Sequence, residues 1–417
     1  MAKSKIVTLG CRLNSLESEM LRKQTADLDD VIVVNTCSVT AEAERQARQT
    51  IRRLKRENKN ARIIVTGCAA QVNPEQFAQM SEVSKVVGNR EKMEISRYIP
   101  LTHNDDDKVV VSPRDMLNET AHHLISGMEN HTRAFVQIQQ GCNHKCSFCI
   151  IREARGPSWS LPQEQILEQI KKLMDFGHKE IVLTGVDISS WGQDFDNKAS
   201  LGELVGLILR NISELPRLRL SSLDPAVHDA ALLETLAEER FMPHLHLSLQ
   251  AGENRVLANM GRRHNTQSAA ELIAKIRDIS PHISLGADMI TGFPKESDAQ
   301  FEATYNFIKE QNIPLLHVFP YSARKGTPAA KMRAIPKAER KARATKLRQL
   351  GLELKANWLK SFLGTTASIL VEANGRGYSP HYAPVSLNNT SYEGKIVQAI
   401  FTHIEDERLV AEVIKNS

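Results

Sequence analysis

The sequence predicts an α/β protein of three domains: an N-terminal parallel-sheet domain, a central partial barrel of six β/α units, and a small C-terminal β-barrel. Short β-branched runs alternate with helical patterns through the first three quarters of the chain. A basic helix is then predicted over 336–360, and only short β runs follow it. A chain of 417 residues is too long for one core. We place the domains at 1–110, 128–357 and 358–417, with a linker or flap at 101–133.

The N-terminal domain is predicted from three β-branched runs that are too short for helices. Helical patterns separate them, so strand–helix–strand alternation implies a parallel sheet with right-handed crossovers. The strands are expected at 5–9, 31–35 and 61–66, and the helices at 15–26 and 40–59. Each run is followed by a cysteine: Cys11, Cys37 or Cys68. Because parallel strands share one carboxyl edge, we expect these three sulfur atoms to converge there.

Alternation resumes in the central domain. Six units fall short of the eight that close a barrel, so an open arc is expected. Its strands are expected at 134–139, 180–184, 218–222, 244–249, 283–290 and 315–319, with helices such as 162–176 and 268–279. The β runs 367–372, 396–401 and 409–414 indicate a small barrel of the OB kind.

Composition points to the redox compartment. The chain is 41% hydrophobic and 25% charged, with no apolar window long enough to cross a bilayer and no signal peptide at the start. We therefore expect a cytoplasmic protein with no membrane partner. Cytoplasmic thiols stay reduced, so the six cysteines indicate metal ligands or catalytic groups before disulfides.

Basic residues gather in two stretches. Residues 324–348 hold ten Lys and Arg against the single acid Glu339, and a second basic run occupies 45–56. Such local excess suits a phosphate backbone, although a solvated helix face explains either run alone.

Half of the cysteines form one tight run, Cys-x3-Cys-x2-Cys. Three thiolates at this spacing can bind three corners of a [4Fe-4S] cluster and leave one iron open. Zinc usually takes four ligands, commonly from two Cys-x2-Cys pairs, and there is no second pair. His144 is a possible fourth ligand, but a solvent-facing or hydrogen-bonded role is favoured. The run consists of Cys142, Cys146 and Cys149.

At this run the sequence resembles the radical S-adenosylmethionine enzymes, whose signature has an aromatic residue before the last cysteine, as Phe148 is here. The strand-end cysteines narrow the resemblance to the methylthiotransferases, and the tail resembles their RNA-binding TRAM domain. Matching motifs include GCRLN at 10–14, NTCSVT at 35–40, VTGCAAQ at 65–71, HLHLSLQAG at 244–252, DMITGFP at 288–294 and HVFPYS at 317–322.

The resemblance implies two [4Fe-4S] clusters and S-adenosyl-L-methionine. All six cysteines would then be metal ligands and catalytic, with the second cluster on Cys11, Cys37 and Cys68. Three buried structural cysteines are the alternative for that triplet. Candidates for nucleoside and cofactor contacts are Gly185, Asp187, Asp224 and Gln250; turn roles are the alternative for Gly185 and Asp224.

For several other polar and aromatic residues, a role in the active site and a purely structural role are both considered. Tyr321 and Phe319, at a strand end, are candidates for stacking on a base, with a core role favoured for Phe319. Asp288 and Thr291 face the barrel mouth or cap turns, and Arg262 and Arg263 bind phosphate or are solvated.

The pair Arg-Leu inside GCRLN resembles the branch that acts on N6-threonylcarbamoyladenosine at tRNA position 37, beside the anticodon. The isopentenyladenosine branch typically has Gln-Met there, and the ribosomal-protein branch Pro-Lys. The resemblance implies conversion of adenine C2–H to C2–S–CH3. Departures from the family pattern at Arg152, Glu153 and Trp159 concern fine pocket contacts.

The partners implied are the tRNA anticodon stem-loop, an electron donor such as flavodoxin or ferredoxin, and a sulfur donor. The alternatives are the same chemistry on isopentenyladenosine of tRNA or on a ribosomal protein, or a non-catalytic iron–sulfur RNA-binding protein.

Overall fold

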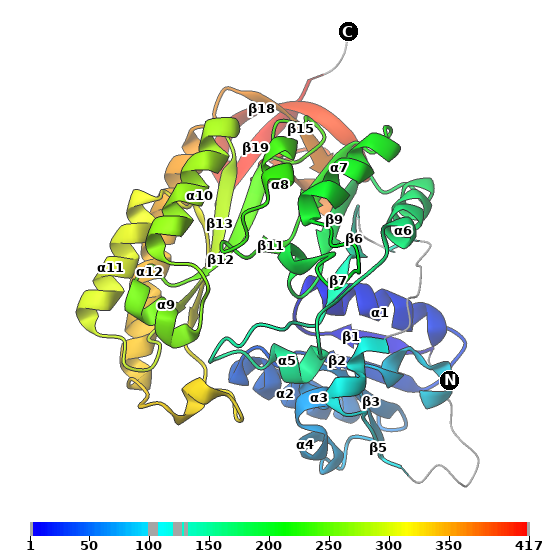
Figure 1. Ribbon diagram of the computed structural model, residues 1–417. Coiled ribbons are helices and arrows are strands. Elements are labelled where there is room, and N and C mark those ends of the chain that lie inside the picture. Colours follow the sequence, from blue (N-terminus) through cyan, green and yellow to red (C-terminus); the bar gives the residue numbers. More distant parts are fainter. Residues whose placement is uncertain (1–2, 99–106, 120–126, 129–131, 415–417) are drawn as a thin grey trace.

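The computed structural model describes residues 3–98, 107–119, 127–128 and 132–414 (Figure 1). Its elements follow the predicted order of a parallel sheet, a larger α/β domain and a β-barrel. Of the part of the chain that is described, no helix is long and apolar enough to span a bilayer.

The N-terminal domain is a five-stranded parallel sheet in the order β1-β2-β3-β4-β5. The three predicted strands are confirmed, because their β-branched side chains fill the core between sheet and helices. The elements are β1 (Lys5–Thr8), α1 (Arg12–Gln24), β2 (Val31–Thr36), α2 (Ala41–Glu57), β3 (Arg62–Gly67), α3 (Cys68–Val72), α4 (Pro74–Ala78), β4 (Lys85–Val87), η1 (Glu91–Met93), η2 (Ile95–Arg97) and β5 (Val109–Val110).

The expected linker at 101–133 is partly wrong. Strand β5 lies inside it and pairs with β4, so this part belongs to the sheet. The short helix η3 (Arg114–Glu119) also lies there. Residues 101–106, 120–126 and 129–131 are outside the described residues.

The central domain is an open arc of parallel strands, as predicted. It divides into the sheets β10-β9-β6 and β11-β12-β13-β14, because the third predicted strand, 218–222, breaks at Ser221 into β10 and β11. The strands are β6 (Arg133–Gln137), β7 (Gln139–Gln140), β8 (Trp159–Ser160), β9 (Glu180–Thr184), β10 (Arg217–Leu220), β11 (Ser222–Leu223), β12 (His244–Gln250), β13 (Ser284–Thr291) and β14 (Leu315–Pro320).

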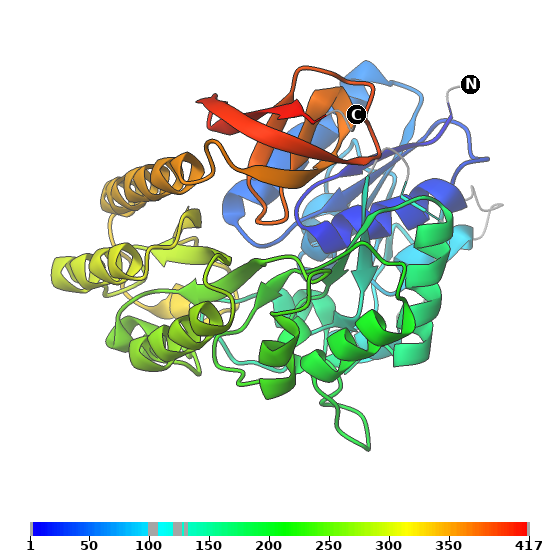
Figure 2. The same ribbon diagram turned by 90° about the horizontal axis from the view of Figure 1, so that it is seen from above.

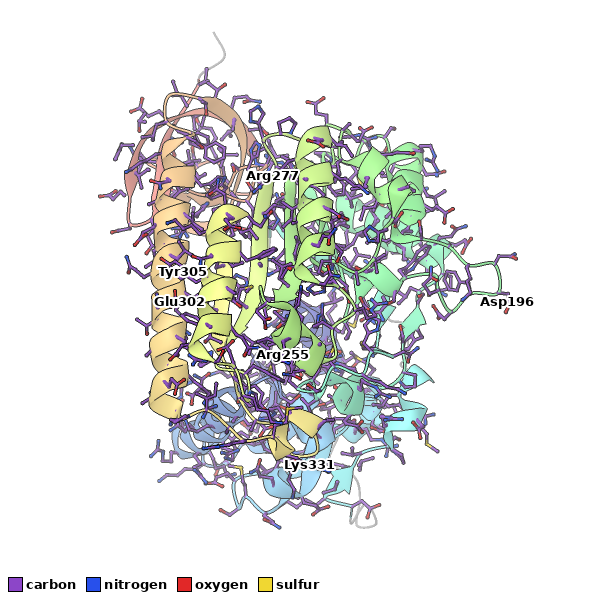
Figure 3. All side chains as sticks on the ribbon, turned by 60° about the vertical axis from the view of Figure 1, so that its left-hand side comes forward. Asp196, Arg255, Arg277, Glu302, Tyr305 and Lys331 are labelled. Carbon is purple, nitrogen blue, oxygen red and sulfur yellow. The ribbon has the colours of Figure 1, made fainter. Side chains whose placement is uncertain are left out.

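Helices cover the outer face of this arc, and α10, α11 and α12 lie side by side there (Figure 3). Their apolar faces pack on the strands in the largest core of the protein. The helices are α5 (Ile151–Arg155), α6 (Gln163–Asp175), η4 (Ile188–Ser190), α7 (Leu201–Asn211), α8 (Ala230–Thr235), α9 (Asn254–Met260), α10 (Thr266–Ile279), α11 (Asp298–Glu310), η5 (Pro328–Lys331) and α12 (Lys337–Lys360).

The C-terminal domain is a closed five-stranded barrel in the order β15-β16-β17-β19-β18. The three predicted strands are confirmed, and two very short ones were not foreseen. The elements are β15 (Thr366–Val371), η6 (Ala373–Gly375), β16 (Arg376–Tyr378), β17 (Pro384–Leu387), β18 (Ile396–Glu405) and β19 (Arg408–Val413).

The barrel contacts both other domains. Figure 2 shows it in orange and red beside the N-terminal domain in blue. Arg12 of α1 donates a hydrogen bond to the hydroxyl of Tyr382 at 3.2 Å. Arg217 of β10 donates to the carbonyl of Ser368 at 2.7 Å, and Arg133 pairs with Glu372 at 2.8 Å. The three domains therefore meet around one region.

Candidate active site

The three strand-end cysteines come together at the carboxyl edge of the N-terminal sheet. Cys11 is the N-cap residue of α1, Cys37 follows β2, and Cys68 begins α3 directly after β3. These strands are adjacent and parallel, so their carboxyl ends share one edge. All three cysteines line the same cavity, and Cys68 and Cys11 lie close enough to Cys37 to help raise the pKa of its thiol, as the predicted convergence requires.

Gly10 allows the first two cysteine loops to approach each other. Its φ is +105°, a conformation that favours glycine. A Cβ at Gly10 would lie 2.7 Å from the Cβ of Cys37 and 3.0 Å from its sulfur. The amide of Asn14 holds the same turn by donating to the carbonyls of Leu9 at 2.7 Å and Thr36 at 3.0 Å.

A buried group of charges joins this edge to the central domain. Arg155, at the end of α5, donates from Nε to the sulfur of Cys68 at 3.2 Å and from Nη2 to Oδ1 of Asn14 at 2.6 Å. Its guanidinium also pairs with the carboxylate of Glu17, which Lys92 contacts at 2.6 Å. Burial opposes ionisation of Glu17, but the two cations outweigh it and lower its pKa to about 2.

The second triplet lies in a tightly folded loop after β7. Gly141 has φ +69°, and a Cβ there would lie 1.7 Å from the carbonyl oxygen of Pro157. Ser147 ties the loop to the end of α9, because its N–H donates to the carbonyl of Met260 at 2.8 Å and its hydroxyl to that of Asn259 at 2.7 Å. The loop thus presents to the cavity the sulfur atoms of Cys142, Cys146 and Cys149.

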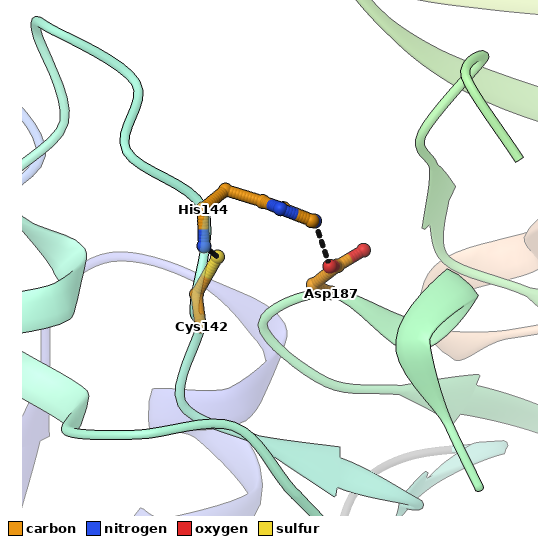
Figure 4. Close-up of side chains that lie close together, drawn as sticks. All are labelled: Cys142, His144 and Asp187. Carbon is orange, nitrogen blue, oxygen red and sulfur yellow. Dashed lines mark hydrogen bonds and ion pairs between the residues drawn. The ribbon is translucent and has the colours of Figure 1, made fainter. Parts of the chain in front are cut away.

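His144 and Asp187 form a pair beside this loop (Figure 4). The distance from His144 Nε2 to Asp187 Oδ2 is 2.6 Å, and the hydroxyl of Ser190 donates to the same carboxylate at 2.5 Å. The backbone N–H of His144 donates to the sulfur of Cys142 at 3.4 Å. The imidazole therefore has a polar partner, as the favoured interpretation of His144 expects.

Asp224 directs an arginine toward the second triplet. Its carboxylate pairs with Arg262 at 3.4 Å and Arg263 at 3.0 Å, and Nη1 of Arg262 lies 3.6 Å from the sulfur of Cys146. Burial opposes ionisation, but the two guanidinium groups hold the pKa of Asp224 below its ordinary value. Asp224 also accepts from the N–H of Ala226 at 2.9 Å, so it has the expected turn role as well. Neither arginine is merely solvated.

One cavity of about 1140 Å³ contains both triplets. This volume exceeds that of typical single-ligand pockets, so it has room for a nucleotide beside a second small molecule. All four predicted contact residues line it: Gly185, Asp187, Asp224 and Gln250. Gln250 has φ +69°, which is rare for a side-chain-bearing residue and common at functional sites.

Two expectations about strand-end residues are wrong, and one of the two alternatives for Thr291 is excluded. Phe319 is not in the core: its residue is 43% exposed and lines the cavity, because β14 is the edge strand of its sheet. Tyr321 is buried and packs edge-on against Phe293 at 5.4 Å, so it is not placed to stack on a base. Thr291 is buried and donates to the carbonyl of Arg340 at 3.5 Å instead of facing the barrel mouth.

The basic stretch 324–348 is partly internal. Arg324 is buried and pairs with Glu44 of α2. Arg343 is buried against Glu296 at 2.7 Å and Asp298 at 2.8 Å. These two arginines hold elements together, so they are not phosphate contacts.

Sequence reasoning missed two histidines around Asp288, which does face the cavity. His246 Nε2 lies 3.0 Å and His317 Nδ1 3.3 Å from Asp288 Oδ1. Burial opposes ionisation of Asp288, but the two imidazoles hold its pKa well below the ordinary value. The signal was their place in the motifs HLHLSLQAG and HVFPYS, on the two strands that flank that of Asp288, where His317 is the register partner of Asp288.

Both triplets fit an iron–sulfur cluster by their donor chemistry. Each supplies three thiols, and the sequence has no cysteine left for a fourth. Burial raises the pKa of Cys37 and Cys149 to about 11 and of Cys142 to about 12, so these thiolates need a positive centre nearby. In each triplet one sulfur also accepts an arginine N–H, from Arg155 or Arg262, which favours a ligated thiolate.

Comparisons with known proteins agree with this geometry. The model of the Radical SAM superfamily matches residues 136–308, and that of the Uncharacterized protein family UPF0004 matches residues 3–88. Threonylcarbamoyladenosine tRNA methylthiotransferase MtaB of Rickettsia prowazekii is 44% identical, over 97% of this chain and 96% of its own.

Two further similarities have lower sequence identity. The tRNA-2-methylthio-N(6)-dimethylallyladenosine synthase of Clostridium botulinum (strain Okra / Type B1) is 30% identical over 89% of this chain and 86% of its own. The radical S-adenosylmethionine methyltransferase TsrM of Kitasatospora setae superposes with a TM-score of 0.56 at 13% identity, covering 79% of this chain and 77% of that one. This last likeness concerns the fold alone.

Replacing Gly10 with alanine should disrupt the strand-end triplet. The new Cβ meets Cys37, so we expect reconstituted iron to fall from about eight to about four atoms per chain. Gly177→Ala is the matched control, since Gly177 has φ +107° and no heavy atom within 4 Å of an added Cβ. Both variants place a side chain at a positive φ, but only the one at Gly10 meets another residue. Iron analysis of both variants, with thermal melts, therefore distinguishes the effect of the contact with Cys37 from that of backbone strain. Full iron in Gly10→Ala would contradict the role of Gly10.

Replacing Glu17 with glutamine should lower the free energy of unfolding by about 3 kcal/mol, because Arg155 and Lys92 lose their buried counterion. The folded pKa of Glu17 is about 2 against 4.5 in the unfolded chain, so the carboxylate's contribution is complete above pH 4.5 and declines as the pH falls toward 2. Urea unfolding at several pH values measures both effects. Glu57→Gln, at an exposed ion pair with Arg53, should change stability by less than about 1 kcal/mol.

Proposed function

The chain belongs to the radical S-adenosylmethionine methylthiotransferases, and we propose that it converts N6-threonylcarbamoyladenosine at position 37 of tRNA to its 2-methylthio derivative. The observation that carries this proposal is the single cavity lined by both cysteine triplets. Family membership implies a [4Fe-4S] cluster and S-adenosylmethionine. We further propose a second cluster on Cys11, Cys37 and Cys68, with the first on Cys142, Cys146 and Cys149.

When bound, these groups would supply three things: the methyl group, the sulfur, and the radical that activates the C2–H bond. The chain's own residues hold and orient them. Arg262 and Arg155 each direct an N–H at one ligand sulfur, and such hydrogen bonds tune the potential of an iron–sulfur cluster. Phe148 lines the cavity and packs edge-on against Phe293 at 6.4 Å, so this part of the wall is apolar.

The substrate is proposed from relatives and from the cavity. The relative at 44% identity is named for threonylcarbamoyladenosine, whereas the one at 30% is named for dimethylallyladenosine. A base next to the anticodon lies in a loop, so it can be splayed out and presented to an enclosed pocket. Exposed Phe319 on the cavity wall is positioned to stack on such a base.

Phosphate contacts are proposed on helices next to the cavity. Thr40 and Ala43, at the start of α2, and Leu352, on α12, line it. Both helices carry exposed cations that are free of the internal pairs described above, including Lys337, Lys341 and Arg348 on α12 and Arg56 on α2. An electron donor such as flavodoxin or ferredoxin and a sulfur donor complete the proposed partners, and a tRNA substrate places the reaction in the cytoplasm.

Replacing Cys146 with alanine should abolish reductive cleavage of S-adenosylmethionine, whereas Cys37→Ala should keep cleavage and lose methylthiolation. The two triplets would hold different clusters, so removing a ligand from each should abolish a different activity. Anaerobic assays of 5′-deoxyadenosine and of methylthiolated RNA measure both. Survival of both activities in Cys37→Ala would refute the sulfur-delivery role of its triplet.

Deletion of the gene should remove 2-methylthio-N6-threonylcarbamoyladenosine from cellular tRNA. Mass spectrometry of tRNA nucleosides detects it. An unchanged level of that nucleoside, with loss of the isopentenyl counterpart, would replace the proposed substrate with the alternative one.

A further inference from the structure

Four arginines gather where the three domains meet. Arg133, Arg217 and Arg219 come from β6 and β10, and Arg12 comes from the first turn of α1. Three of their guanidinium groups lie over the ring of Tyr382, at 5.9 Å for Arg12, 5.3 Å for Arg133 and 4.9 Å for Arg219. The fourth, that of Arg217, donates to the carbonyl of Tyr378 at 3.5 Å.

Only two carboxylates of the described chain pair with these four cations. Glu180 lies 2.7 Å from Arg219 and 3.5 Å from Arg217. Glu372 lies 2.8 Å from Arg133. Among the described residues no carboxylate lies within ion-pair distance of Arg12, so the group carries excess positive charge in a largely buried place. Uncompensated charge of this kind is costly unless an anion joins it.

Arg12 is the member of this group that reaches the cavity. It lines the cavity together with Cys11, His244 and Tyr382. Its guanidinium is held between the ring of Phe135, at 6.0 Å, and that of Tyr382, whose hydroxyl accepts its hydrogen bond. One N–H group is thus used for positioning, and the rest of the planar fork is available for a ligand.

We propose that Arg12 binds the carboxylate of the threonylcarbamoyl substituent on the substrate base. This inference rests on the proposed function. The substituent ends in a carboxylate, the anion that a guanidinium binds in two-pronged fashion, whereas a dimethylallyl group is an uncharged hydrocarbon. Arg12 would therefore be a specificity-determining residue that rejects bases without this anion.

A backbone phosphate is the other source of an anion at this place. The carboxylate is favoured because Arg12 is half-buried beside Cys11 inside the cavity. Phosphates of a bound stem-loop stay on the outside, where the exposed cations of α2 and α12 lie. The carboxylate is present only when base 37 carries the threonylcarbamoyl group, whereas the phosphates are present whatever base 37 is. Changing base 37 therefore distinguishes the two sources.

The test measures binding of the full-length, cluster-loaded protein to three synthetic anticodon stem-loops. They differ only at base 37, which is adenosine, N6-threonylcarbamoyladenosine or the methyl ester of the latter. Fluorescence anisotropy should show that wild type prefers the free carboxylate. Arg12→Gln should raise the Kd for that stem-loop by about 10- to 100-fold and leave the other two within about twofold. Arg12→Lys keeps the positive charge but lacks the planar fork, so its Kd for that stem-loop should lie between those of wild type and Arg12→Gln.

Arg22→Gln is the matched control, because Arg22 lies on the same helix and pairs with Glu19 outside the arginine group. It should bind all three stem-loops as wild type does. Equal weakening of all three by Arg12→Gln would assign Arg12 to phosphate and overturn the proposal. Unchanged binding in Arg12→Gln, or a wild type that does not distinguish acid from ester, would overturn it too.

Methylthiolation by wild type separates this inference from the proposed function. If wild type modifies the threonylcarbamoyl stem-loop but Arg12→Gln binds it equally well, only the inference fails. If wild type modifies neither the acid nor the ester, the proposed function itself fails.

Discussion

The structure depends on one buried arginine at the boundary between two domains. Arg155 ends α5, the short helix that follows the loop of the second cysteine triplet, yet its guanidinium contacts Glu17 and the sulfur of Cys68 in the N-terminal domain. A fully buried guanidinium is tolerated only when its charge and its donors are satisfied. Glu17, Asn14 and Gln140 satisfy them, so the correct docking of the two domains and the neutralisation of this charge are the same event.

This docking explains why the cavity has two walls that carry cysteines. Parallel strands in both domains direct their carboxyl ends inward, and Arg155 fixes how the two edges face each other. The C-terminal barrel then docks through Arg133 and Arg217 and contributes Tyr382 to the cavity. Residues from all three domains line it, so no domain alone forms the site.

Features that depend on local sequence patterns were predicted correctly. Strand-end cysteines had to converge because strand direction and side-chain position follow from β-branched runs and crossovers, and the open arc followed from counting units. Family resemblance supplied the cofactors. Reasoning failed where distant contacts decide exposure: Phe319 is exposed because β14 is an edge strand, and Arg324 is buried because Glu44 lies opposite. Arg12 was recognised only by its place in GCRLN. Its neighbours Phe135 and Tyr382 are more than a hundred positions away, and that it has no carboxylate partner among the described residues appears only in the folded protein.

We propose that one cavity holds two iron centres, each on three cysteines. Anomalous diffraction at the iron edge, from crystals grown without oxygen, would locate them. We expect two iron centres in the same cavity, one beside Cys142, Cys146 and Cys149 and the other beside Cys11, Cys37 and Cys68. A single iron centre, a zinc signal in place of iron, or disulfides within either triplet would contradict it.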